Sequence, residues 1–403
     1  MPAIVRRINL EVDAGGSSVP NVLSARVRFD FNQRVSQASF VTPIPPGGAS
    51  YDDDVVIRMG IVGGGNENTQ RFRGVIRSFN ITGPPTRVET VCYGYLQRAV
   101  EYQNWEDSHS VPVGGLIPLD LTGTQPDTAA NIVQAVLDRC DIPGGLYSGH
   151  IGSTSTLYGV IMDPFVWRNG RNDTIYNLLE SGETAISYIE RYDEIDAHLA
   201  SSSSGGRYRT FETLGGDIYR FEVGGRPRGA SVTFGRGNTF TQGQDILEGS
   251  FQRTLIDFKN YIVVTGYDVG GGAGPFFFPA PGDPGYGGGG RKTYQFNSPM
   301  IEKSHDGDLL PDGSTEGMSC ETVAGVLNLD YNREKVTGTL VTFLDDPIGL
   351  AQTHTVNAPN MLGTSEPLWV QSLEISVDEN GFRQRIGYLG GGSPDSGLPD
   401  PPG

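Results

Sequence analysis

The sequence lacks the features that mark secreted and membrane-spanning proteins. Its three cysteines, Cys92, Cys140 and Cys320, are odd in number, far apart and form no C-x-x-C motif. This pattern favours buried thiols in a reducing compartment over a disulfide framework. The start, MPAIVRRINLEVDAGG, has no apolar core long enough for a signal peptide, and no run approaches the ~18 apolar residues of a membrane span. We therefore expect synthesis in the cytoplasm of a cell and no membrane-spanning segment.

Positive charge is also scarce. Lys and Arg total 30 against 47 Asp and Glu, which gives a formal net charge of −17 over 403 residues. Binding of nucleic acid depends on clustered cations, so this balance argues against a surface that grips DNA or RNA. An acidic wall would instead let DNA slide past without sticking.

Motifs for catalysis and metal binding are absent. The histidines show no i, i+4 pair and no H-E-x-x-H, and no G-x-S-x-G elbow occurs. Acidic clusters are plentiful, but no calcium-loop spacing appears and no pair of glycosidase acids can be ordered from sequence. We interpret these clusters as solvated turns and predict no catalytic residue, no cofactor and no metal. The clusters are Asp52-Asp53-Asp54, Asp193-Glu194, Asp345-Asp346 and Asp378-Glu379.

One glycine-rich stretch raises the question of a nucleotide site. Residues 234–243 read FGRGNTFTQG, but no lysine follows Gly243 as a Walker A loop requires. Phe240 occupies the position of the third glycine of a dinucleotide fingerprint, and the flanks ASVTF and ILEGSFQ are typical of strands. We therefore interpret the stretch as a turn between strands.

Glycine and β-forming residues dominate what is present. With 57 Gly, 26 Pro and 19% charged residues, the composition favours β structure joined by tight turns. Period-2 alternation from 6 to about 102, with a turn every ten or so residues, predicts an antiparallel barrel or sandwich. Strand patterns resume after 207 and continue to 389, including VAGVLNLDYN at 323–332. There Glu379-Asn380-Gly381 predicts a hairpin turn.

The middle of the chain has a different pattern. Apolar residues at helical spacing predict a helix over 126–140, and a shorter one over 172–180. The run SSSSGG at 201–206 is typical of a flexible boundary. The chain is thus expected to be mainly β with a smaller α+β part in between.

A Gly/Pro-rich insertion at 268–292 carries three consecutive phenylalanines. Gly and Pro fill 14 of the 21 positions from 270 to 290. Exposure of Phe276, Phe277 and Phe278 to water would be unfavourable by roughly 1.5–3 kcal/mol each. They either fold back on their own domain or, with Tyr286, contact a partner.

The ordered set of motifs resembles the tail-hub or baseplate-hub family of bacteriophages, which is related to the base of type VI secretion spikes. The resemblance rests on YDDDVVIRMG, RFRGVIRSFNITGPPTRVETVCYGYLQRAVEY, the helix from Thr128 to Leu137, Gly235-Arg236-Gly237-Asn238 before a strand ending in Gly266, and the hairpin SLEISVDENGFRQRIGYL. It covers about 6–390, and the insertion departs from the family pattern.

The resemblance implies two tube-protein-like antiparallel β-barrels flanking a helix-containing middle domain. The expected divisions are 1–105 for the first barrel, 106–206 for the middle domain, 207–395 for the second barrel and 396–403 for a disordered tail. It also implies a homotrimer in the virion tail tip, which adapts a six-fold tail tube to a three-fold tip. The implied partners are a hexamer of distal-tail or tail-tube protein above and tip, spike or fibre proteins below. Phage DNA would pass through the lumen without specific binding.

Two alternatives stay open from the residues. One is a β-rich enzyme that degrades cell-wall polysaccharide, although no separate domain is left for a lytic site. The other is a carbohydrate-binding or receptor-binding tail protein, which would fit the turn-rich β pattern and the aromatic residues.

Overall fold

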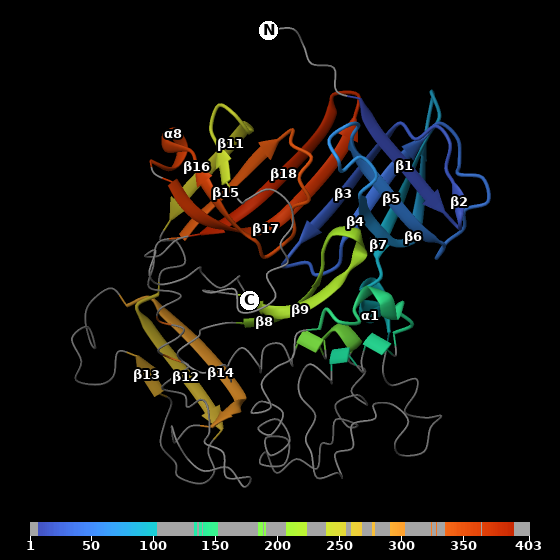
Figure 1. Ribbon diagram of the computed structural model, residues 1–403. Helices are drawn as coiled ribbons and strands as arrows, with labels where there is room; N and C mark the ends of the chain where they lie inside the picture. The colour runs from blue at the N-terminus through green and yellow to red at the C-terminus, as the bar shows by residue number, and fades with distance from the viewer. Residues whose placement is uncertain are drawn as a thin grey trace, which may run out of the picture.

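The computed structural model describes most of the two β-rich ends of the chain and short parts of the middle (Figure 1). The described ranges are 7–102, 133–134, 137–138, 140–151, 184–187, 189–190, 207–223, 239–254, 259–267, 276–278, 291–302, 324, 328, 335–363 and 365–390.

A 13-stranded, almost entirely antiparallel sheet dominates the molecule, which confirms the mainly β fold. We call its first part the N-terminal unit, with β1 (Ile8–Ala14), β2 (Ser17–Ser18), β3 (Ser24–Asp30), β4 (Gln37–Thr42), β5 (Asp54–Ile61), β6 (Gln70–Thr82) and β7 (Arg87–Gly94). The second part, the C-terminal unit, has β10 (Thr239–Thr241), β11 (Ile246–Thr254), β15 (Lys335–Thr342), β16 (Thr353–Asn357), β17 (Ser365–Asp378) and β18 (Gly381–Gly390).

Alternation in the sequence explains which face of each strand is buried. In β3, Ala25, Val27 and Phe29 are at most 3% exposed, whereas the arginines between them point outward. Successive side chains of a strand point to opposite faces, so one apolar row packs into a core. The large core joins residues of both units.

The two units repeat the same arrangement of six strands. The hydrogen-bonded order is β1-β5-β6-β7-β4-β3 in the N-terminal unit and β10-β16-β17-β18-β15-β11 in the C-terminal unit. Each strand therefore has a counterpart, and the counterparts follow one another in the same order along the chain. One corresponding pair differs, because the three-residue β10 runs parallel to β16 whereas β1 runs antiparallel to β5.

The longest hairpins of the two units share an irregularity at the same place. The β6–β7 ladder shifts register between Ile76 and Ser78, and the β17–β18 ladder shifts between Val370 and Ser372. Such bulges bend a strand and increase its twist. We align the two shifts so that Ile76 corresponds to Val370 and Ser78 to Ser372. Through the strand pairing, this alignment gives residues of the N-terminal unit their counterparts in the C-terminal unit.

That correspondence matches side chains in the neighbouring strands. It places SFVT of β4 on TLVT of β15, with Thr42 and Thr342 as counterparts that are both buried. Each threonine hydroxyl bonds the backbone two residues on. The Thr42 hydroxyl donates to the carbonyl of Ile44 at 2.6 Å, and the Leu344 N–H donates to the hydroxyl of Thr342 at 3.0 Å. The repeat therefore extends from strand order to single contacts.

The repeat locates a large insertion. Residues 31–36 join β3 to β4, whereas the counterpart connection between β11 and β15 runs from 255 to 334. It carries a small sheet of β12 (Tyr261–Tyr267), β13 (Phe276–Phe278) and β14 (Thr293–Glu302), in the order β13-β12-β14. The Gly/Pro-rich segment thus belongs to an elaborated hairpin connection of the C-terminal unit.

The remaining elements pack below the N-terminal unit in Figure 1. They are α1 (Gln97–Glu101), the 3-10 turns Gly144–Leu146 and Leu214–Gly216, and the hairpin of β8 (Arg207–Glu212) and β9 (Ile218–Val223). A second apolar core gathers here, with Leu96 and Ile218 fully buried. A further short helix, α8 (Pro359–Leu362), lies in the C-terminal unit.

Sequence patterns predicted helices and one turn with mixed results. Val133 and Leu137 are helical and fully buried, as expected within 126–140. The Glu379-Asn380-Gly381 turn joins β17 to β18, with φ of 107° at Gly381. The expected strand at 323–332 is wrong at its described residues, since Ala324 and Asn328 are helical. A short apolar run does not distinguish a buried strand from a buried helix.

Several predicted segments lie outside the described residues. These are the helix over 172–180, the SSSSGG boundary at 201–206, the Gly235-Arg236-Gly237-Asn238 turn and the tail at 396–403. The division into domains and the closure of each unit into a barrel remain predictions.

Candidate functional site: the junction between the units and its open counterparts

The two units are joined by direct strand pairing. Six residues of β17, from Ser372 to Val377, pair antiparallel with β3, from Asp30 back to Ala25. The inward side chains of β17 in this stretch, Leu373, Ile375 and Val377, are at most 6% exposed. Just beyond the ladder, the ring of Phe31 meets Trp369 edge-on at 4.8 Å. The junction is thus an apolar continuation of one sheet across two units.

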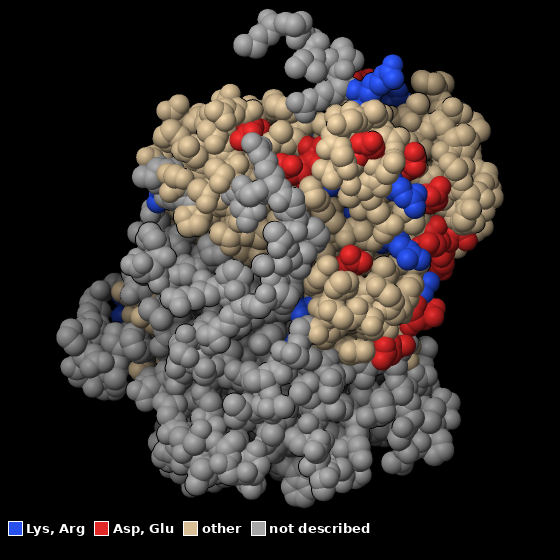
Figure 2. Space-filling view, viewed as in Figure 1, with Lys and Arg blue, Asp and Glu red and all other residues tan. Residues whose placement is uncertain are grey.

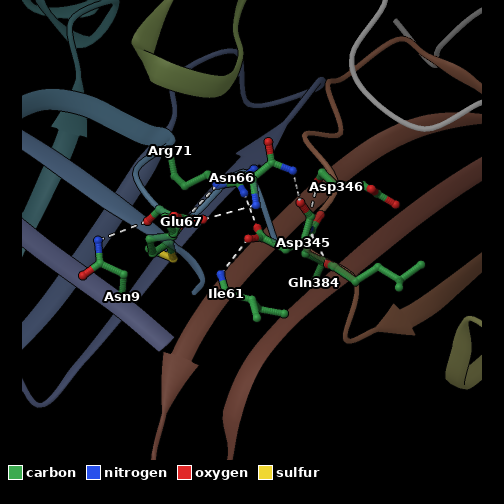
Figure 3. A network of polar contacts seen from close by, with 11 residues as sticks. Asn9, Ile61, Asn66, Glu67, Arg71, Asp345, Asp346 and Gln384 are labelled. Atoms are coloured by element: carbon green, nitrogen blue, oxygen red, sulfur yellow. Dashed lines mark hydrogen bonds and ion pairs between the residues drawn. The ribbon is translucent and has the colours of Figure 1, made fainter. Parts of the chain in front are cut away.

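A buried polar network reinforces the junction (Figure 3). The Asp345 carboxylate lies in the connection after β15, and it accepts hydrogen bonds from the backbone N–H of Ile61 at 2.6 Å and from the guanidinium of Arg71. Asn66 donates its amide N–H to the Asp345 carbonyl at 2.7 Å. Gln384 of β18 holds the same connection by donating to the carbonyls of Leu344 and Asp346. The C-terminal unit is therefore bound through hydrogen bonds to β5, to β6 and to the loop between them.

The interpretation of Asp345-Asp346 as a solvated turn is wrong for Asp345. The residue is 9% exposed, and the Arg71 side chain is fully buried. Burial raises the pKa of the Asp345 carboxyl and lowers the pKa of Arg71, because both charged forms lose water. A buried ion pair gives little net stability, but removal of one partner is costly, so such a pair specifies geometry. A long-range contact of this kind has no local sequence signal.

A second buried carboxylate attaches the β8–β9 hairpin to the N-terminal unit. Glu212 accepts hydrogen bonds from the backbone N–H and the hydroxyl of Ser36, both at 2.7 Å, and from the backbone N–H of Leu96 at 2.6 Å. A Cβ on Gly94 would lie 1.9 Å from a Glu212 oxygen, so glycine is needed there. Burial raises the pKa of Glu212 to about 7 in spite of these donors.

Exposed charges alternate on the N-terminal unit (Figure 2). Arg77 pairs with Asp52 and Glu101, Arg73 pairs with Asp54 at 3.2 Å, and Arg98 pairs with Asp141 at 2.9 Å. These pairs link β5, β6 and α1 to the turn around 141. Exposed pairs contribute roughly 0–1 kcal/mol each, so they align these elements more than they stabilise them.

The expected contact residues in the insertion are described only in part. Phe277 lies in β13 and stacks on Tyr261 of β12, with ring centroids 5.9 Å apart. Phe276 and Phe278 share that strand and pair with Val264 and Ile262. Tyr286 lies outside the described residues. A contact of these residues with a partner remains a prediction.

The described residues contain no group of three or more His, Cys, Asp or Glu side chains placed to hold a metal ion. His354 is buried, and its Nδ1 and the Tyr388 hydroxyl form a hydrogen bond of 2.8 Å. Burial lowers the pKa of His354 to about 4, so its ring is neutral at pH 7. Burial also raises the pKa of Cys92 above its usual range and that of Cys140 to about 12, which keeps both thiols protonated. Across the described ranges, no helix is both long and apolar enough to cross a membrane.

No known protein family and no curated protein matches the sequence. Solved structures do match over nearly the whole chain. The tail protein of Neisseria meningitidis MC58 matches with a TM-score of 0.58 at 9% identity, over 98% of both chains. The 43 kDa tail protein of prophage MuSo2 from Shewanella oneidensis matches with a TM-score of 0.55 at 9% identity, over 97% of this chain and 99% of that one. The chain thus shares its fold with phage tail proteins, and the expected likeness is confirmed at the level of the fold.

Proposed function

We propose that this chain is a structural virion protein, the hub at the distal end of a phage tail. Three copies would form a ring beneath the tail tube and surround part of the DNA channel. The observation that carries the proposal is the repeat of six strands in the same order, with a register shift at the same place in the longest hairpin of each unit. Three copies of a twice-repeated unit offer six similar surfaces, which suits an adaptor between six-fold and three-fold parts.

Matched exposed side chains support this symmetry argument. Ser24 of β3 pairs with Val41, and Glu248 of β11 pairs with the counterpart Val341. Ser24 and Glu248 are therefore counterparts, and a leucine precedes each of them. Leu23 is 51% exposed and Leu247 is 54% exposed. Exposed apolar side chains at matching positions are what two units need to bind identical partner subunits.

The proposed partners follow from this arrangement. A hexamer of distal-tail or tail-tube protein would bind the six matched surfaces, and tip, spike or fibre proteins would bind the three-fold side. DNA would pass through the lumen without specific binding, in keeping with the net charge of −17. The protein would act by fit and symmetry, with no catalysis and no cofactor.

A mass measurement on the purified chain, combined with negative-stain images, tests the proposal. We expect a ring with three times the chain mass of 43.3 kDa. A monomer that clears a peptidoglycan suspension would contradict the hub and favour a lytic enzyme.

A further inference from the structure

The junction within the chain has a counterpart that the chain leaves open. At the junction, the second half of β17 pairs with β3. The counterpart of β17 is β6, and the counterpart of β3 is β11. Among the described strands, the second half of β6 pairs with β7 alone and β11 pairs with β15 alone. Among the described strands, each unit therefore leaves one strand edge unpaired. The counterpart of that edge in the other unit forms the junction.

The open edge of β6 exposes apolar side chains whose counterparts are covered. Ile375 is fully buried where β17 meets β3, whereas its counterpart Ile81 is 66% exposed. Leu344 packs against the large core beside the junction, whereas its counterpart Ile44 is 60% exposed. Tyr51, which is 66% exposed, contacts the ring of Phe79 at 5.4 Å. An exposed apolar cluster along an unpaired strand edge is typical of a protein interface.

We propose that β6 of one subunit pairs antiparallel with β11 of a second copy of this chain, repeating between subunits the β17–β3 pairing within the chain. This inference rests on the proposed hub and names the surface through which its subunits assemble. The apolar side chains of β6 and of the β4–β5 connection would then be covered in the way that their counterparts in the C-terminal unit are.

The junction fixes the register of the proposed pairing. Ile375 lies opposite Val27, and the correspondence converts these residues to Ile81 and the partner's Phe251. The neighbouring pairs become Asn80 with the partner's Gln252 and Thr82 with the partner's Ser250. In this register Ile81 faces an apolar ring, Asn80 and Thr82 face polar side chains, and Phe79 faces the partner's Arg253. No like charges oppose each other.

The positions of the two edges favour a closed ring. β6 and β11 lie on opposite flanks of the molecule (Figure 1). Pairing between different surfaces is head-to-tail, and it gives a ring when the rotation closes. A ring that closes after three subunits would contain six units. Around this ring, junctions within a chain would alternate with junctions between chains.

Cysteine cross-linking tests the register directly. The double variant Ile81→Cys/Phe251→Cys places two thiols on directly opposite residues, where Cα atoms lie about 4.5–5.5 Å apart and a disulfide can form. We expect mild oxidation to give covalent dimers and trimers on a non-reducing gel. In the control Ile81→Cys/Gln252→Cys, the shift by one residue turns one thiol to the other face of the sheet. We expect at least tenfold less cross-linked product from that control and from the wild-type chain.

A charge variant gives an independent measurement. Ile81→Asp places an exposed carboxylate on the proposed interface, and we expect at least tenfold weaker association by native mass. The matched control Val62→Asp changes an apolar side chain that is 48% exposed, next to the end of β5 that pairs with β1 and away from both edges, and should keep the trimer. Cross-linked species larger than trimers would overturn the closed ring.

The outcomes separate this inference from the proposed hub. A trimer that forms no Ile81–Phe251 cross-link and survives Ile81→Asp overturns the strand pairing and leaves the hub intact. A chain that stays monomeric at high concentration and forms no cross-link overturns both.

Discussion

Among single residues, the buried carboxylates carry most of the information about how the parts are joined. Asp345 connects the two units, and Glu212 connects the β8–β9 hairpin to the N-terminal unit. Each carboxylate accepts hydrogen bonds from backbone N–H groups far away in the sequence. Such contacts favour the observed arrangement of the parts, because a buried carboxylate that loses its hydrogen-bond donors is costly.

Glu212 predicts a pH dependence of stability. Its pKa is about 7 in the folded chain against 4.5 as the ordinary value. The folded state therefore holds a proton that the unfolded state releases between these values, so stability falls as pH rises from about 4.5 to 7, by about 3 kcal/mol at most. Glu212→Gln cannot titrate and should lack this loss. We expect the thermal midpoint of the wild type, measured relative to that of the variant, to fall between pH 5 and pH 7.5.

The comparison with the variant isolates Glu212 from other titrating groups. A difference in midpoint that stays constant, or that grows in favour of the wild type as pH rises, would show that the carboxylate is ionised throughout and held by its three donors.

At the level of the strands, corresponding cross-strand pairs in the two units divide the side-chain volume differently between the two strands. Val27 lies opposite Ala38 in the N-terminal unit, and their counterparts Phe251 and Gly338 lie opposite each other in the C-terminal unit. A Cβ on Gly338 would lie 2.3 Å from the ring of Phe251. A larger side chain on one strand is thus matched by a smaller one on the other.

This difference in side-chain volume predicts that a substitution at Phe251 recovers the stability lost by a substitution at Gly338. Gly338→Ala alone should destabilise the C-terminal unit by about 1–3 kcal/mol, because Phe251 has to move. The double variant Gly338→Ala/Phe251→Val, which copies the volumes of the N-terminal unit, should recover most of that loss. Chemical denaturation of the four chains of this double-mutant cycle measures the coupling. Additive effects of the two substitutions would contradict the correspondence at this position.

The strands were largely predictable from sequence, and their partners were not. Alternation in β3 and the Asn380-Gly381 turn identified strands and a hairpin because both signals are local. The pairing of β17 with β3 joins residues more than 340 positions apart, and no periodicity reports it. The same limit applies to Asp345, whose burial depends on Arg71 and Ile61 of the other unit.

For the whole molecule, the repeat of six strands connects the fold to the proposed role. A single chain with two similar units can present six similar surfaces from three copies, and the junction within the chain supplies the pattern for the junction between chains. The large insertion between β11 and β15 is where the two units differ most.

A three-dimensional reconstruction of the assembled ring would show directly how the two units of each chain are arranged around the axis. The proposed hub predicts three copies around a three-fold axis, in which a rotation of about 60° superposes each N-terminal unit on a neighbouring C-terminal unit. The proposed junction between subunits predicts continuous strand pairing from β6 of one subunit to β11 of the next. A ring in which the two units lie at different radii, or an assembly without three-fold symmetry, would contradict the proposed hub.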